Sequence, residues 1–218
     1  MKLSELFEST ELRDVDKDQS KWIDYNQFGQ PMTIISVETL SRKYDVLEDL
    51  VISGLTNEHF KVALAKSKIM AGVFKMVKHP DTNELGLAII CLVYFKHPII
   101  ENPPNDMVGL MLQVDRVATV PAYEAMYIAT RLYSTLVNAG YVVVSDTVQY
   151  RGGMKLWKKI ARHTVTGDYN VHIFDRKLND YLKDDNNQIL TYNGSNLPDT
   201  AIWLTGKPGQ QFILIAKS

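Results

Sequence analysis

Five basic side chains fall within residues 155–163 and form the clearest charge cluster in the chain. Such a cluster can bind phosphate or nucleic acid, because Lys and Arg neutralise phosphate charge and donate hydrogen bonds to its oxygens. Its more common role is a solvated helix face. Both interpretations stay open for these residues, which are Lys155, Lys158, Lys159, Arg162 and His163.

The other reactive residue types show no spacing that predicts metal or nucleophilic chemistry. The five histidines are scattered without zinc-ligand spacing, so we interpret them as surface or loop residues and expect no metal site. The chain has neither a Gly-x-Ser-x-Gly sequence nor a Walker A sequence. Its single cysteine, Cys91, lies within an apolar run and is interpreted as a buried small hydrophobic residue.

The composition is that of a globular protein, and it argues against two classes of partner. The 218 residues are 45% hydrophobic and 22% charged, with a formal net charge of −1. This balance favours neither nucleic acid nor a membrane surface as a partner. No stretch reaches the roughly 20 consecutive apolar residues that a membrane helix needs. Residues 1–12 contain acids and lack the apolar core of a signal peptide, so we expect a cytoplasmic protein.

The N-terminal half predicts a polar segment and then a mixture of strands and helix. Residues 1–30 are the most polar part, and Leu3, Leu6 and Phe7 suit a short amphipathic helix that docks on the domain or on a partner. A strand is expected over residues 32–37 and a helix over residues 40–53. Two runs rich in β-branched and aromatic residues, 69–77 and 85–95, flank a group of turn formers and predict a β-hairpin.

The C-terminal half predicts alternating strands and helices. Residues 107–120 predict a long strand ended by Pro121, and an amphipathic helix follows from Tyr123 to Val137 and stops at Gly140. Further elements are expected as a strand over 141–145, a loop over 146–153, a helix over 154–162, and strands over 171–174, 201–204 and 211–216. A strand–helix–strand unit with short loops implies a parallel pair. The predicted fold class is therefore α/β, or α+β, with a mixed sheet flanked by helices in one domain over residues 31–218.

Two segments give this order of elements a family resemblance. Residues 117–133 (VATVPAYEAMYIATRLY) resemble the acyl-CoA-binding motif of the GNAT superfamily. In that motif a valine-rich strand, a loop with proline and an aromatic residue, and a Gln/Arg-x-x-Gly-x-Gly/Ala turn lead into a helix. Residues 143–157 (VVSDTVQYRGGMKLW) resemble the next strand and helix, in the form of bacteriophage-encoded GNAT-like proteins. The resemblance covers residues 68–174 and implies a GNAT-like central mixed sheet.

The resemblance implies an acetyl-CoA site at the start of the amphipathic helix. GNAT proteins hold the coenzyme pyrophosphate on backbone N–H groups at a helix N-terminus, and glycines let the phosphates approach closely. This chain has Glu124, Tyr127 and Ala129 at the corresponding positions, so a carboxylate and a phenol stand where the motif has phosphate-compatible residues. The implied cofactor-binding residues are Val117, Thr119, Tyr127, Ile128, Ala129, Thr130 and Arg131.

The resemblance also implies positions for a general acid and a general base. The family's acid is a tyrosine near the acyl sulfur, and the matching position here is Trp157, which is no useful acid. Tyr150, seven residues earlier, is the candidate substitute. The candidate bases are Asp115, on the long central strand, and Asp146, at the end of the next strand. Asp146 has an alternative role, because an aspartate at a strand-to-loop junction can cap the N–H groups that follow.

Two functions stay open. The first is an acyl-CoA-dependent N-acyltransferase, in which the partners are acyl-CoA and a primary amine acceptor that attacks the thioester. It needs an open cleft between the strand that ends at Val120 and the strand that ends at Ser145. The second is a non-catalytic GNAT-fold phage protein with a protein partner, either a virion component or a host-factor binder, whose coenzyme site is closed by Tyr127.

Overall fold

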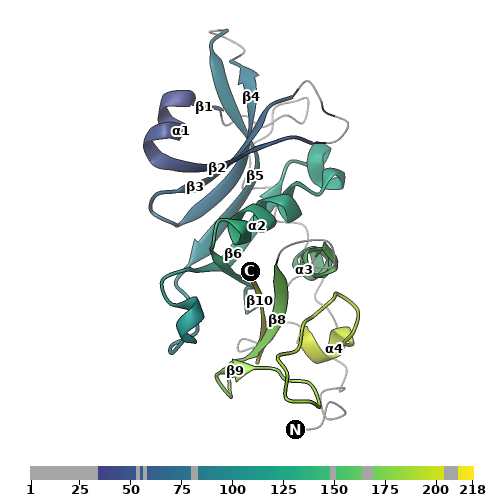
Figure 1. Ribbon diagram of the computed structural model, residues 1–218. Helices are drawn as coiled ribbons and strands as arrows, with labels where there is room; N and C mark the ends of the chain where they lie inside the picture. The colour runs from purple at the N-terminus through teal and green to yellow at the C-terminus, as the bar shows by residue number, and fades with distance from the viewer. Residues whose placement is uncertain are drawn as a thin grey trace. The chain divides into compact units, whose positions relative to one another are not determined.

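The computed structural model describes residues 34–52, 55, 58–79, 83–147, 151–163, 169–203 and 211–218. These residues form a mixed α+β protein with few helices and a large, mostly antiparallel sheet of ten strands (Figure 1). The strands are β1 (Ile34–Ser36), β2 (Tyr44–Leu50), β3 (Phe60–Ala65), β4 (Met70–Lys78), β5 (Leu85–Lys96), β6 (Met111–Thr119), β7 (Val142–Val144), β8 (Asn170–Asp175), β9 (Asp180–Tyr181) and β10 (Phe212–Lys217). The helices are α1 (Val37–Lys43), η3 (Asn105–Met107), η4 (Pro121–Met126), α2 (Ile128–Asn138), α3 (Arg151–His163) and α4 (Asp199–Ile202).

The chain divides into two compact units. Unit 1 holds the described residues of 97–114 and 136–218, and unit 2 holds those of 34–96 and 115–135. The division falls inside β6 and inside α2, so both units share these continuous elements. A boundary that cuts through a strand and a helix is not the flexible linker expected between two domains. The single domain expected over residues 31–218 stays a prediction. The N-terminal segment expected over residues 1–30 lies outside the described residues.

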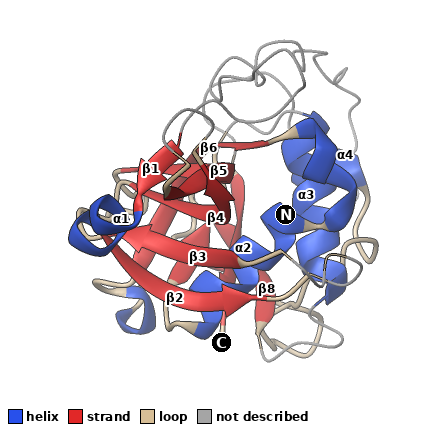
Figure 2. Ribbon diagram, turned by 90° about the horizontal axis from the view of Figure 1, so that it is seen from above, coloured by secondary structure: helices blue, strands red, loops and turns tan. Residues whose placement is uncertain are grey.

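Unit 2 is built around the predicted hairpin, which the structure confirms. Strands β4 and β5 pair antiparallel from Met70↔Tyr94 to Lys78↔Leu85. One face of these strands packs against α1, where Leu40 meets Phe74 and neighbouring apolar residues (Figure 2). The helix begins where the Ser36 side chain accepts a hydrogen bond from the backbone N–H of Thr39, which satisfies one of the free donors of its first turn.

Two expectations for unit 2 are wrong in detail. The helix predicted over 40–53 ends at Lys43, and β2 follows it and pairs with β3, a strand that the sequence pattern did not predict. A β-bulge between Val46 and Glu48 shifts the register of this pair. The extra residue breaks the alternation that identifies a strand, and it leaves Leu47, Leu50 and Val51 at a spacing that imitates a helix. Of the strand expected over 32–37, residues 34–36 form β1, Val37 begins α1 and the rest lies outside the described residues.

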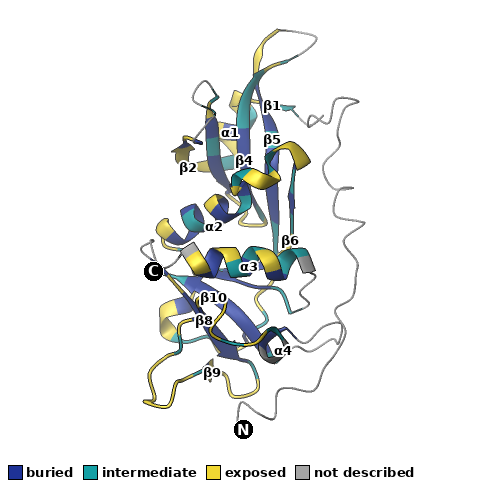
Figure 3. Cartoon of the chain, turned by 90° about the vertical axis from the view of Figure 1, so that its right-hand side faces the viewer, coloured by how far each residue is buried: buried dark blue, intermediate teal, exposed yellow. Residues whose placement is uncertain are grey.

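Unit 1 contains the predicted parallel pair. The first residues of β6 pair with β7 at Met111↔Val142, Leu112↔Val143 and Gln113↔Val144, and α2 connects the two strands. The last strand, β10, lies antiparallel between β7 and β8. Helix α3 packs on β8 through a buried stripe, which Figure 3 shows beside its exposed face. The stripe consists of Met154, Trp157, Ile160 and Ala161.

Other boundaries differ from the sequence expectations. The helix expected from Tyr123 is divided: residues 121–126 form the 3₁₀ helix η4, and α2 begins at Ile128. Helix α3 begins at Arg151 rather than at residue 154. The strand expected over 201–204 is wrong, because α4 occupies Asp199–Ile202. In the part of the chain that the structure describes, no helix is long and apolar enough to cross a membrane.

Candidate functional site

The turn that leads into α2, in unit 2, has an unusual backbone conformation. Strand β6 ends at Val120, whose N–H donates to the carbonyl of Ile90 at 2.8 Å. Pro121 then opens η4, where its fixed φ suits a first helical turn. Tyr127 closes η4 with φ 58° and ψ 25°, the left-handed region that favours glycine. A non-glycine residue therefore holds the conformation that a glycine holds most easily, directly before α2.

The N-terminal residues of α2 combine free backbone donors with mixed side-chain exposure. The first backbone hydrogen bond runs from the N–H of Arg131 to the carbonyl of Tyr127 at 3.0 Å, so the N–H groups of residues 128–130 precede it and point out of the helix end. Ile128 and Thr130 are buried, whereas Arg131 is exposed. Glu124 and the half-exposed Tyr127 ring also lie at this end. The helix dipole here favours an anion, and the Glu124 carboxylate opposes one.

Two other predicted cofactor residues lie on β6. Val117 and Thr119 are both half-buried. The Thr119 hydroxyl donates to the Cys91 sulfur on β5 at 3.2 Å, so this hydroxyl has a role inside unit 2. Ala129 is half-buried in the first turn of α2. Of the seven predicted cofactor residues, the structure thus gathers Tyr127, Ile128, Ala129, Thr130 and Arg131 at one helix end.

A polar anchor that the sequence did not reveal holds η4 to the sheet of unit 2. The Lys75 ammonium group on β4 donates to the Tyr123 hydroxyl at 2.9 Å and lies 2.8 Å from the Glu58 carboxylate. Burial lowers the pKa of Lys75, but the hydrogen bonds to Glu58 and Tyr123 outweigh it and raise the pKa overall. The Phe60 ring packs edge-on against the Tyr123 ring, with centroids 6.2 Å apart. The turn before Tyr127 is therefore fixed by one cation and two aromatic rings.

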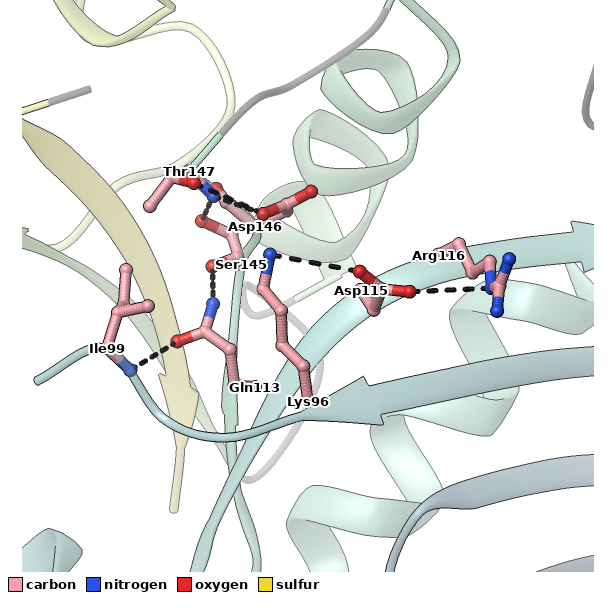
Figure 4. Close-up of polar contacts among 8 residues, drawn as sticks. All are labelled: Lys96, Ile99, Gln113, Asp115, Arg116, Ser145, Asp146 and Thr147. Atoms are coloured by element: carbon pink, nitrogen blue, oxygen red, sulfur yellow. Dashed lines mark hydrogen bonds and ion pairs between the residues drawn. The ribbon is translucent and has the colours of Figure 1, made fainter. Parts of the chain in front are cut away.

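Asp115, the first candidate base, forms ion pairs at the surface of unit 2. Its carboxylate lies 3.9 Å from the Lys96 ammonium group and 3.4 Å from Nε of Arg116 (Figure 4). Its side chain is 40% exposed, and the Arg116 guanidinium lies 4.8 Å from the centre of the Tyr94 ring. The Lys96 and Arg116 contacts thus involve both oxygens of this carboxylate. The geometry favours a surface ion pair.

Asp146, the second candidate base, caps the loop that follows β7 in unit 1. Its carboxylate accepts from the backbone N–H of Thr147 at 2.6 Å and from the Thr147 hydroxyl at 3.3 Å (Figure 4). These contacts match the capping role weighed for it as an alternative. Tyr150, the candidate acid, lies outside the described residues. Trp157, at the position of the family's acid, lies on the buried face of α3 at 1% exposure.

Gln113 on β6 is a buried polar residue that sequence reasoning missed. Its side-chain amide N–H₂ donates to the backbone carbonyl of Ser145, and its amide oxygen accepts from the N–H of Ile99 at 3.5 Å (Figure 4). Gln113 and Ser145 are both fully buried. The Ser145 hydroxyl accepts from the N–H of Leu214 at 2.9 Å. The Gln113 side chain thus satisfies the carbonyl directly after the paired part of β7.

A buried cluster of titratable groups in unit 1 corrects the expectation that the histidines lie at the surface. His172 on β8 is 9% exposed and packs edge-on against Tyr181, with ring centroids 5.6 Å apart. The Tyr181 hydroxyl donates to the Met107 sulfur at 3.2 Å, and the Lys217 ammonium group lies 4.7 Å from the centre of its ring. Lys217 also pairs with Asp106. Burial lowers the pKa of His172, and the Leu190 carbonyl partly opposes this.

The lowered pKa of His172 predicts that the folded protein loses stability as the pH falls below about 6.5. The unfolded chain binds the proton more readily than the folded state, so the free energy of unfolding falls as the pH drops from about 6.5 through the folded-state pKa of His172, and it levels off at lower pH. Urea unfolding between pH 5 and pH 8 measures the slope. His172→Gln should flatten it, and the exposed His97→Gln should leave it unchanged. Equal slopes for both variants would contradict the assignment.

Two further observations bear on identity, one about metal ligands and one about similarity to known proteins. Within the described residues, no group of three or more His, Cys, Asp or Glu side chains could hold a metal ion. Comparison of the chain with protein-family models, with curated proteins and with solved structures found no match.

Proposed function

We propose that this chain is a GNAT-like acyl-CoA-dependent N-acyltransferase that binds acetyl-CoA at the N-terminus of α2 and transfers the acetyl group to a primary amine. The observation that carries this proposal is the left-handed conformation of Tyr127, at the position where the acyl-CoA motif has a glycine. The described elements support it, because antiparallel strands β3, β4 and β5 precede the series β6-α2-β7-α3-β8 and the final strand β10. This is the order that the resemblance implies.

In this proposal the backbone does most of the binding. The N–H groups of residues 128–130 and the dipole of α2 hold the pyrophosphate, and Arg131 adds a positive charge from the first turn. The anchor formed by Lys75 and Tyr123 keeps the turn in place before the ligand arrives. Asp115 and Asp146 both have structural partners, so positioning of the amine against the thioester, rather than a strong base, supplies the rate enhancement.

A second function is favoured by three side chains, two of them in unit 2 and one in unit 1. Glu124 places a negative charge beside the anion site, the Tyr127 ring stands where the motif leaves space, and the buried Trp157 replaces the family's acid. Together they fit a GNAT-like scaffold that has lost its coenzyme and acts by binding a protein, as a virion component or a host-factor binder. The chain then has no acyl-transfer activity.

Isothermal titration with acetyl-CoA tests the two functions. The transferase proposal predicts micromolar binding by the unmodified protein, a loss of about tenfold in Arg131→Gln, and no loss in Arg42→Gln, an exposed arginine of α1 in the same unit. Release of free thiol in the presence of simple primary amines then reports turnover.

Tyr127→Gly separates the two functions. Glycine removes the strain of the left-handed conformation, which is about 1–2 kcal/mol. It also makes the unfolded chain more flexible, which destabilises the fold by about 0.5–1 kcal/mol. Because the two effects nearly cancel, this variant should fold. Binding by Tyr127→Gly alone would mean a closed coenzyme site and would favour the protein-binding function. An absence of binding in both proteins would exclude the coenzyme from this turn.

A further inference from the structure

Four antiparallel strands of unit 2 bring lysines together at one end of the sheet. The register places the start of β2 beside the end of β3, and the start of β4 beside the end of β5. Two backbone hydrogen bonds join these strand ends, from Lys66 N–H to the Lys43 carbonyl at 3.0 Å and from Phe95 N–H to the Ile69 carbonyl at 2.8 Å. The lysines at this end are Lys43, Lys66 and Lys68, which are exposed, and the half-buried Lys96.

This end of the sheet is positively charged, although the chain as a whole is not. Arg116 adds a fifth cation from β6, the strand next to β5. The acids of the same strand segments are Asp45 and Asp115, and Asp115 pairs with Lys96 and Arg116. Five cations against two acids leave an excess of positive charge here, whereas the formal net charge of the chain is −1. Such a local excess attracts a polyanion.

A row of side chains crosses the sheet beside these cations. The Tyr44 hydroxyl on β2 donates to the Met70 sulfur on β4 at 3.1 Å, and Met70 is paired with Tyr94 on β5. Burial raises the pKa of Tyr44, and the nearby Tyr94 phenol adds to the rise. The Arg116 guanidinium lies 4.8 Å from the centre of the Tyr94 ring. Both tyrosines are half-buried and Arg116 is exposed, so ring and guanidinium surfaces remain in contact with solvent.

The row and the cations have the dimensions of a short nucleic-acid strand. Neighbouring strands of a sheet lie about 4.8 Å apart, so four steps from β2 to β6 cover about 19 Å. A positive surface that follows a phosphate backbone, with aromatic rings or guanidinium planes on which bases stack, is how proteins bind single strands. A duplex cannot use these rings in the same way, because its bases are already stacked on one another.

We propose that this end of unit 2 binds single-stranded nucleic acid. The lysines contact phosphates, and a base stacks on the Tyr94 ring together with the Arg116 guanidinium. The chain's net charge does not indicate this function, because the five cations come from separate segments and meet only in the folded sheet. The inference goes beyond the proposed acyl transfer and does not depend on it, since none of these residues belongs to the proposed coenzyme site.

Fluorescence anisotropy with labelled oligo(dT) and oligo(U) of about 12 nucleotides tests the lysines. The unmodified protein should bind at least one of them at 50 mM salt, and more weakly at 200 mM salt. Lys43→Gln combined with Lys68→Gln should weaken binding about tenfold and reduce the slope of log Kd against log salt by about 1.4, because each single-strand phosphate contact contributes about 0.7. Lys78→Gln is the matched control, since Lys78 is exposed at the opposite end of β4 and should not affect binding.

Two substitutions of Tyr94 test stacking in the same assay. Tyr94→Leu keeps an apolar side chain but removes the ring, so affinity for the single strand should fall about tenfold. Tyr94→Phe keeps the ring and should bind as the unmodified protein does. Far-UV circular dichroism checks that both variants are folded.

Four outcomes would overturn the proposal. Two concern affinity alone: neither oligonucleotide binds, or Lys78→Gln loses as much affinity as the Lys43 and Lys68 double variant. A third is full affinity in Tyr94→Leu, which would exclude stacking on this ring. The fourth is equally tight binding of a duplex of the same length or of a poly-glutamate peptide, which would mean that the surface attracts any polyanion.

Discussion

Alkylation of Cys91 should be at least about a thousand times slower in the folded protein than in the unfolded chain. Burial raises the pKa of this thiol to about 12, and the hydrogen bond from Thr119 offsets only part of the rise. An unperturbed cysteine has a pKa near 8.5, so burial alone removes more than about 99.9% of the reactive thiolate at neutral pH. The side chain is also fully buried on β5, paired opposite Val73 of β4. Reaction therefore requires this hairpin to open.

Mass spectrometry with iodoacetamide at pH 8, in native buffer and in urea, measures both rates. The chain has a single cysteine, so the mass gain identifies the site. Val51→Cys supplies a matched control, because Val51 is 73% exposed in the same unit and a thiol there should react at nearly the unfolded rate. Cys91 alkylation within about tenfold of the unfolded rate would contradict a packed β4–β5 pair.

The sequence predicted those elements whose patterns are local and uninterrupted. The β4–β5 hairpin, the strand–helix–strand unit of β6, α2 and β7, and the burial of Cys91 all follow from runs of apolar residues bounded by turn formers, and all are confirmed. The assignment failed where backbone geometry departs from a simple period. The bulge in β2 imitated a helix, and the left-handed Tyr127 divided one predicted helix into η4 and α2.

The polar contacts of the candidate site were largely beyond prediction, for a physical reason. Asp146 caps its immediate neighbour, and such a contact follows from local sequence. Lys75 bonds to Tyr123, which lies 48 residues away, and Gln113 bonds to Ser145 across 32 residues. Neither pair can be recognised from a repeating pattern in the sequence. Each depends on which segments lie side by side in the folded chain. A lone glutamine within an apolar strand was the one available signal, since a buried amide must find partners.

Gln113→Leu should lower the free energy of unfolding by about 2–4 kcal/mol. The substitution keeps an apolar side chain of similar length but removes the donor to the Ser145 carbonyl and the acceptor for the Ile99 N–H. Each buried backbone group left unpaired costs about 1–3 kcal/mol, and the longer, weaker Ile99 contact belongs at the low end. Urea unfolding at pH 7 measures the change.

Gln211→Leu makes the same chemical change in unit 1 at a position where less should be lost. Gln211 donates to Oδ2 of Asp175 at 2.7 Å, whereas the N–H groups of Lys177 and Leu178 bond to the other oxygen, Oδ1. Because Gln211 is only half-buried, water can replace its amide at Oδ2 in the variant. We expect a loss of about 1 kcal/mol. If Gln113→Leu lowered the free energy of unfolding no more than Gln211→Leu, water must reach the Ser145 carbonyl in the variant. A buried carbonyl with neither a donor nor water would cause a larger loss. The end of β7 would then be accessible to solvent once the amide is removed. A larger loss for Gln113→Leu than for Gln211→Leu means instead that the Ser145 carbonyl stays dry and depends on the Gln113 amide.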